Sequence, residues 1–282
     1  MRLIVILGAG ELGGAVARQL AASHVASRIV VVDEARAIAE GKALDIRQAS
    51  PIDGYNAEVV GASDESTVVG ADAIVLADRA SGTGAEWQGD LGLALVQRVA
   101  YLNRSAMIVC AGAAQVDIVE RGVREAAVPR ARLLGSAAEG LRSAVVAMTA
   151  LEAGCSPSEV SLAVVGRPPN HIIVPWDEAA IGGRRATAVL SASSVARLDA
   201  RLPRLWPPGP LTLATAAARL LAIAARRGRD GLSIFVATLR EEGEAGRVAM
   251  MPATIGPGGV VQLLAPTLST RDRVRLDTAL RR

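Results

Sequence analysis

The chain has 282 residues, of which 51 % are hydrophobic and only 2 % aromatic, and its formal net charge is +3. This length suffices for one large or two modest domains, and a core of Ala, Val, Leu and Ile favours closely packed helices on a sheet. Because the arginines are mixed with acidic residues and base-stacking aromatics are scarce, the composition argues against nucleic-acid binding.

The first half of the chain alternates strand and helix patterns. Short β-branched runs predict strands at 2–7, 28–33, 57–62, 73–77, 106–111 and 132–136. Helical patterns lie between them at 11–22, 36–49, 88–102, 115–126 and 138–153. Apolar strands separated by helices are typical of a parallel sheet that is covered on both faces.

The second half predicts a different arrangement, in which most strands are joined by loops and turns. The expected strands are 161–167, 171–176, 232–240, 247–256 and 260–266, and the expected helices are 211–227 and 270–281. We therefore expect an α/β fold with a doubly wound parallel sheet in residues 1–137, followed by a mixed α+β domain in residues 138–282.

The opening segment LIVILGAGELGG places Gly8, Gly10 and Gly13 between a strand and a helix. In a dinucleotide-binding loop the first glycine permits a tight turn, the second lets the backbone approach a pyrophosphate, and the third allows close packing of helix on strand. Asp33, at the end of the second strand, can accept hydrogen bonds from the ribose hydroxyls of adenosine and would repel a 2′-phosphate. The pattern predicts a Rossmann-type domain that binds NAD, although Arg36 is a feature that favours NADP.

Other patterns limit the location of the protein. Cys110 and Cys155 lie far apart and lack metal-ligand spacing, so we expect reduced thiols, no metal and a cytoplasmic protein. The apolar run at 2–7 is too short for a signal sequence or a membrane span. The Ala-rich stretch at 211–230 is interrupted by Arg219 and predicts a buried helix, so we expect no membrane association.

Three further stretches accompany the glycine motif: GKALDIRQASP (41–51), TALEAGCSPSEV (149–160) and the segment 237–266. With GAGELGG, VVVDE and ADAIVLA, they make the chain similar to the malate/lactate dehydrogenase family, and most of all to its malate dehydrogenases. The resemblance covers essentially the whole chain, with deletions expected around 78–105 and 180–205. It implies hydride transfer between NAD(H) and a 2-hydroxy acid or its 2-oxo acid. In that chemistry a histidine, oriented by an aspartate, moves the proton, and arginines bind the substrate.

The family's mobile loop after the fourth strand carries two arginines, and this chain lacks the pair. Arg79 is the only arginine in ADRASGTGAEWQGDLG, and the position six residues later is Ala85. A gapless alignment from the strand instead puts Gly82 and Gln88 at the two positions. In the same segment the family brings a glycine against the cofactor, where Asp78 of this chain could repel phosphate.

Two other family positions have changed. Ala114 replaces the asparagine that contacts the nicotinamide ribose side. On the helix that carries the orienting aspartate and another substrate arginine, the resemblance places Leu141 and Ala144. Arg142 can replace that arginine if the preceding loop is two residues shorter; otherwise it is a surface or interface residue. Glu139 is the only acidic residue near enough to replace the aspartate.

His171 is one of only two histidines in the chain. The family's catalytic histidine falls on Pro168 or Pro169, depending on the alignment. Residues i and i+2 of an extended chain point to the same face about 7 Å apart, so His171 could face the same cleft but from a displaced position. The other histidine, His24, follows the first helix and is expected at the surface.

Two hypotheses follow from these residues. One is a 2-hydroxy acid:NAD oxidoreductase with an altered or degraded active site that uses His171, Arg79 or Arg142. The alternative is a catalytically inactive homologue that acts as a structural or regulatory NAD-binding subunit. The resemblance also implies a homo-oligomer, a dimer or tetramer, with the helix at 36–49 in its interface.

Overall fold

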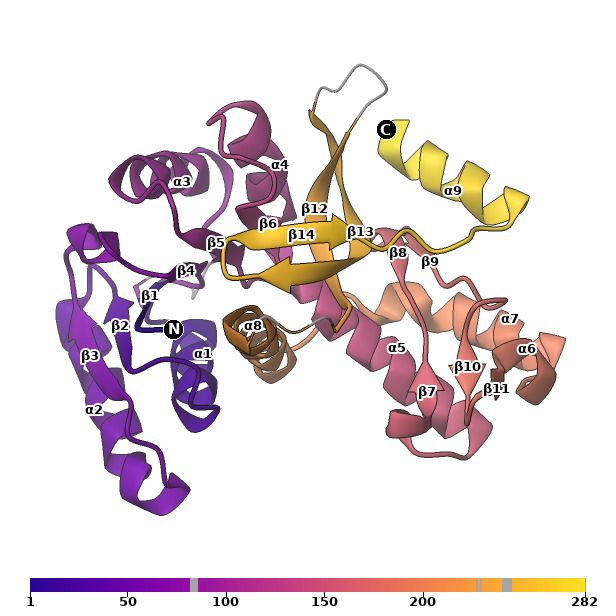
Figure 1. Cartoon of the computed structure of the whole chain (residues 1–282), viewed down its shortest axis with the longest axis horizontal. Helices are drawn as coiled ribbons and strands as arrows, with labels where there is room; N and C mark the ends of the chain where they lie inside the picture. Colours follow the sequence, from indigo (N-terminus) through magenta and orange to yellow (C-terminus); the bar gives the residue numbers. More distant parts are fainter. Residues whose placement is uncertain (82–85, 227, 229, 240–244, 282) are drawn as a thin grey trace.

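The computed structural model of the chain describes residues 1–81, 86–226, 228, 230–239 and 245–281. Among these residues, one sheet of 11 strands runs through the molecule in the order β3-β2-β1-β4-β5-β6-β12-β13-β8-β9, with β14 paired to β13 (Figure 1). The sheet is parallel at the end formed by the first half of the chain and antiparallel at the other end. This arrangement confirms the predicted α/β class.

The parallel part contains the six predicted strands. They are β1 (Leu3–Leu7), β2 (Arg28–Val32), β3 (Glu58–Ala62), β4 (Ala73–Leu76), β5 (Met107–Cys110) and β6 (Leu133–Gly135), and every neighbouring pair is parallel. All residues of β4 and β5 are buried. They are therefore continuous runs of apolar residues, without the alternation of a strand that has one face in water.

Five helices accompany these strands: α1 (Glu11–Ala22), α2 (Arg36–Asp53), α3 (Gly89–Leu102), α4 (Val116–Arg124) and α5 (Ala137–Ala153). The predicted end of the second helix was wrong, because α2 continues past residue 49 and includes Pro51. It ends where Gly54 adopts a φ of +76° and donates its N–H to the carbonyl of Ser50. A glycine in this left-handed conformation is a common helix stop.

The second half adds the antiparallel strands β8 (Val165–Arg167), β9 (His171–Ile173), β12 (Leu232–Leu239), β13 (Ala245–Gly256) and β14 (Gly259–Leu263). A small separate sheet consists of β7 (Val160–Ser161), β10 (Ala180–Ile181) and β11 (Arg184–Arg185). The helices of this half are α6 (Ala186–Val189), α7 (Ala192–Arg201), α8 (Pro210–Arg226) and α9 (Thr270–Arg281). The sequence patterns missed α6 and α7.

The two halves are joined by strand pairing and helix packing as well as by the chain itself. β12 pairs with β6 through Phe235 and Gly135, so the sheet continues across the predicted boundary between residues 137 and 138. α8 packs against both α1 and α5, and lies between them in Figure 1. The division into two domains at residue 137 stays a prediction.

The Ala-rich stretch forms α8, and most of its side chains are buried within the fold. In the part of the chain that the structure describes, no single helix has the length and apolar character needed to cross a membrane. The segments Ala192–Leu205 and Pro210–Arg226 meet the length and composition criteria only together, and they are bent by 95° where they meet.

Candidate functional site

The glycine loop follows β1 and leads into α1, as the motif predicts. Gly8 has a φ of +117°, and a Cβ added there would lie 2.2 Å from the carbonyl oxygen of Asp78. A Cβ on Gly13 would lie 2.0 Å from the carbonyl oxygen of Gly8. The geometry therefore requires glycine at the turn and at the point where α1 packs on the loop.

The second glycine of the motif, Gly10, faces a carboxylate of the chain itself. A Cβ on Gly10 would lie 2.3 Å from Oδ2 of Asp78, and Asp78 is only 5 % exposed. The Asp78 carboxylate accepts the N–H of Leu12 at 3.1 Å and the N–H of Gly13 at 2.8 Å. It thus bonds the free N–H groups in the first turn of α1, where the helix dipole favours a negative charge.

Asp33 follows β2 and is also buried. Its carboxylate accepts the N–H of Ala9 at 2.8 Å, of Ala35 at 2.9 Å and of Ala80 at 2.9 Å. Asp33 therefore joins the glycine loop to the segment after β4. Its predicted contact with a ribose stays a prediction.

Glu86 makes a third carboxylate contact of this kind. Its two oxygens accept the N–H groups of Ala113 at 3.1 Å and Ala114 at 2.7 Å, in the turn that precedes α4. Burial raises the pKa of Glu86, the two N–H bonds lower it in part, and the charge of Asp78 adds to the rise. The exposed Ala114, the residue that the sequence resemblance aligned with an asparagine, donates its N–H to Glu86.

A hollow of about 480 Å³ lies beside the glycine loop. It is lined by Ala9, Gly10, Glu11, Gly14, Ala15, Arg18, Ile38, Lys42, Asp45, Ile46, Arg79, Ala80 and Leu211. The ammonium group of Lys42 donates to the carbonyl of Gly10 at 2.7 Å. The guanidinium of Arg79 lies 5.2 Å from the ring centre of Trp87, a distance typical of a cation–π contact.

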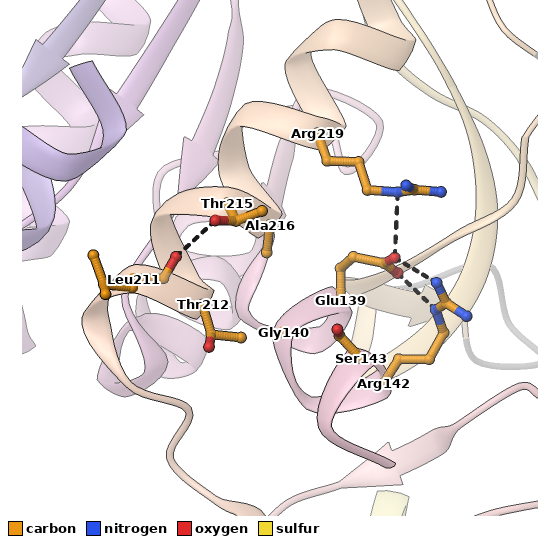
Figure 2. A pocket seen from close by; sticks show the side chains of 9 residues that line it. All are labelled: Glu139, Gly140, Arg142, Ser143, Leu211, Thr212, Thr215, Ala216 and Arg219. Atoms are coloured by element: carbon orange, nitrogen blue, oxygen red, sulfur yellow. Dashed lines mark hydrogen bonds and ion pairs between the residues drawn. The ribbon is translucent and has the colours of Figure 1, made fainter. Parts of the chain in front are cut away.

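A second cavity, of about 350 Å³, lies between α5 and α8 (Figure 2). From α5 it is lined by Glu139, Gly140, Arg142 and Ser143, and from α8 by Leu211, Thr212, Thr215, Ala216 and Arg219. The two helices come close at Gly140, where a Cβ would lie 3.3 Å from the methyl group of Thr212.

The charged groups of this cavity converge on one carboxylate. Arg142 donates to both oxygens of Glu139, at 2.6 and 2.9 Å, and Arg219 lies 3.6 Å away on the opposite side (Figure 2). The buried Glu139 also accepts the N–H of Ser233 in β12 at 3.0 Å. Arg219 is about half exposed and Arg142 about a quarter, so the cavity has an excess of positive charge within reach of solvent.

The predicted catalytic residues do not come together. Arg142 lines the cavity between α5 and α8, whereas Arg79 lines the hollow at the glycine loop. His171 begins β9, where it pairs with Arg167 of β8, and it lines neither space. His24 is exposed in the turn after α1, as predicted.

Gly82 and Ala85 lie outside the described residues. Leu141 is fully buried, which fits its apolar side chain. Sequence reasoning missed Arg219 as a site residue, because only the packing of α8 against α5 brings it to Glu139.

Comparisons with known proteins agree with the fold and the motif. Residues 2–86 match the family model described as lactate/malate dehydrogenase, NAD binding domain. The malate dehydrogenase of Thioalkalivibrio sulfidiphilus is 26 % identical over 300 residues, which cover 99 % of this chain and 96 % of the relative. The malate dehydrogenase of Thermomicrobium roseum is 24 % identical over 292 residues, which cover 98 % and 94 %.

Solved structures of the same kind share the whole fold. The malate dehydrogenase of Salinibacter ruber has a TM-score of 0.86 at 20 % identity, covering 98 % of this chain and 93 % of the other. The lactate dehydrogenase of Cryptosporidium parvum, in complex with lactic acid and β-nicotinamide adenine dinucleotide, has a TM-score of 0.85 at 19 % identity, covering 99 % and 95 %.

The chain thus has the fold that its glycine motif predicts, and residues 2–86 match an NAD-binding domain, in agreement with the predicted NAD. The agreement extends from the motif to the late antiparallel strands. Residues 2–86 therefore match the NAD-binding domain of lactate/malate dehydrogenases, and the chain is similar to malate dehydrogenases over nearly its whole length.

Proposed function

We propose that the chain is a malate/lactate dehydrogenase-like protein with an altered active site, which has lost the family's histidine-dependent proton transfer. One observation carries the proposal. Neither His24 nor His171 lines the cavity between α5 and α8 or the hollow at the glycine loop. A general acid or base must lie within hydrogen-bond reach of the proton that it transfers, directly or through one water.

The charges in the α5–α8 cavity indicate the class of small molecule that it binds. Guanidinium groups bind carboxylates through charge-assisted hydrogen bonds, and Arg219 is about half exposed. A 2-oxo or 2-hydroxy acid is small enough for about 350 Å³ and carries the matching charge. Glu139 is an unsuitable base there because Arg142 holds both of its oxygens.

The alternative function is a structural or regulatory subunit without catalysis. It is supported by the contacts of Asp78 and Glu86, which join the segment after β4 to α1 and to the turn before α4 without any bound molecule. A protein that has to be rigid rather than to turn over substrate benefits from such fixed contacts.

We propose that this protein acts as a homo-oligomer, a dimer or tetramer, through α2. Ile38, Leu44 and Ile52 of that helix are 44 %, 47 % and 87 % exposed, and their spacing places them within one third of the helix circumference. Exposed apolar groups on one side of a helix are typical of a contact surface.

We propose a cytoplasmic location for the protein. Its two free cysteines, Cys110 and Cys155, fit a reducing compartment.

The decisive experiment follows the absorbance of NADH with oxaloacetate, pyruvate and a panel of other 2-oxo acids. We expect slow turnover that His171→Ala leaves unchanged; no turnover above that of a sample without protein would instead support the alternative function. Turnover that His171→Ala abolishes, and that the matched control His24→Ala leaves intact, would overturn the proposal. If Arg219→Ala weakens the binding of a 2-oxo acid measured by calorimetry, the carboxylate site is supported; unchanged binding would contradict it.

A further inference from the structure

The N–H groups that a dinucleotide needs at the glycine loop are already bonded. The N–H groups of Leu12 and Gly13 donate to the Asp78 carboxylate, and the N–H of Gly10 donates to the main-chain carbonyl of Asp78 at 2.9 Å. In a Rossmann-type site these are the donors that meet the pyrophosphate at the helix N-terminus. Asp78 therefore satisfies them from within the chain.

The Asp78 carboxylate lies where the glycine motif would place the pyrophosphate of a dinucleotide. The second glycine of the motif, Gly10, lacks a side chain so that a phosphate can approach the backbone. Here the space beside it holds the carboxylate of Asp78, whose Oδ2 would lie 2.3 Å from a Cβ added to Gly10. Asp78 is only 5 % exposed, so its carboxylate lies in the place beside Gly10 that the motif keeps open for a phosphate. A pyrophosphate that used the same N–H groups would have to displace it.

The segment that carries Asp78 is held from several sides. Asp33 accepts the N–H of Ala80, Asp78 forms a β-bridge with Glu86, and the indole N–H of Trp87 donates to the carbonyl of Leu7 at 3.2 Å. Glu86 in turn bonds the turn before α4. Asp78 can therefore leave the loop only if some of these contacts also break.

We propose that Asp78 is an internal ligand of the dinucleotide site, which competes with NAD for the N–H groups of the glycine loop. NAD then binds only in the conformation from which the carboxylate has withdrawn, and its apparent affinity is reduced by the fraction of molecules in that conformation. The proposal concerns binding and not turnover, so it holds whether or not the proposed loss of catalysis is correct.

The test is an NADH titration, by fluorescence or calorimetry, of the full chain and of three variants. Asp78→Ala removes the competing group, and Asp78→Asn keeps its size but removes its charge. Asp72→Ala is the matched control, because Asp72 also accepts two backbone N–H groups, from Arg2 and Leu3, at the opposite end of β1. We expect Asp78→Ala to bind NADH about tenfold more tightly or better, since an anion at the helix N-terminus is removed, with Asp78→Asn intermediate and Asp72→Ala unchanged.

Thermal unfolding supplies the second readout. Without NADH, Asp78→Ala melts below the native chain, because the first turn of α1 loses its cap. With saturating NADH, the melting temperature of Asp78→Ala rises by more than that of the native chain. Equal NADH affinity in the native chain and Asp78→Ala, or weaker binding by Asp78→Ala, overturns the proposal. If Asp78→Ala does not fold, the same comparison with Asp78→Asn decides.

Discussion

Glu120 of α4 is the group whose removal is expected to destabilise the fold most clearly. Its side chain is only 4 % exposed and accepts hydrogen bonds from Arg167 of β8 at 2.7 Å and from Arg247 of β13 at 3.0 Å. It also accepts the buried backbone N–H of Val248 at 3.1 Å and a hydrogen bond from the guanidinium of Arg124, in its own helix, at 3.3 Å. One carboxylate thus links α4, from the first half of the chain, to two antiparallel strands of the second half.

The cost of Glu120→Gln follows from these contacts. A buried N–H that loses its acceptor costs about 1–3 kcal/mol, and a hydrogen bond between charged groups contributes roughly 1.5–3 kcal/mol. The guanidinium groups keep partial contact with water, which reduces the second contribution. Since the amide of Gln can still accept one bond, we expect a loss of about 2–3 kcal/mol in the free energy of unfolding, or roughly 4–10 °C in melting temperature.

The effect also depends on pH. Burial raises the pKa of Glu120, but the hydrogen bonds from Arg167 and Val248 and the charges of Arg167 and Arg247 outweigh it, so the pKa is lower than usual. The ionised carboxylate therefore stabilises the fold above the usual pKa of 4.5, and this contribution is lost as the pH falls through the lowered value. The difference between the native chain and Glu120→Gln should be largest near neutral pH and shrink in acid.

Chemical denaturation at several pH values measures this difference. The matched control is Glu65→Gln, which removes the more exposed pair with Arg98 and should cost less than about 1 kcal/mol. The reasoning is refuted if Glu120→Gln costs no more than Glu65→Gln at neutral pH, or if its cost grows as the pH falls.

Three further outcomes are expected. Gly13→Ala should lower the free energy of unfolding by about 1–3 kcal/mol, because its Cβ meets a carbonyl oxygen at 2.0 Å, and a melting temperature equal to that of the native chain would contradict this. Gly41→Ala, in open space on α2, should raise the stability by about 0.5–1 kcal/mol in the same denaturation assay, and a loss would contradict the open geometry. Burial, with the charge of Glu86, raises the pKa of Cys110, so only Cys155 should react with a thiol reagent in the native protein; two reactive thiols before unfolding would count against the burial.

The parallel part of the fold was predictable because most of its strands are buried on both faces and the turn after β1 carries the glycine motif. Each strand was placed to within one or two residues. α7 was not predicted because its sequence, ASSVARLDAR, lacks a continuous apolar stripe. Its one buried residue is Leu198. Its local signal was Ser191, whose hydroxyl caps the helix by accepting the N–H of Ser194.

The site was less predictable, because it depends on contacts between distant segments. The glycines and Asp33 are visible as a motif. The N–H groups of the loop, however, have two possible anionic partners: a bound cofactor and the carboxylate of Asp78. A sequence pattern identifies a loop that binds an anion without saying which anion binds there. The meeting of Arg219 with Glu139 likewise depends on the packing of α8 across α5, which no local pattern encodes.

The pairing of β6 with β12 has a consequence for how the protein comes apart. A fragment ending at residue 137 would expose β6 as an unprotected edge strand and would remove α8 from the surface of α1. The two halves are therefore not exchangeable modules, although each resembles a domain. Heat or denaturant should melt them in one cooperative transition, and amide protons of β5 and β6, in the middle of the shared sheet, should exchange with solvent among the last.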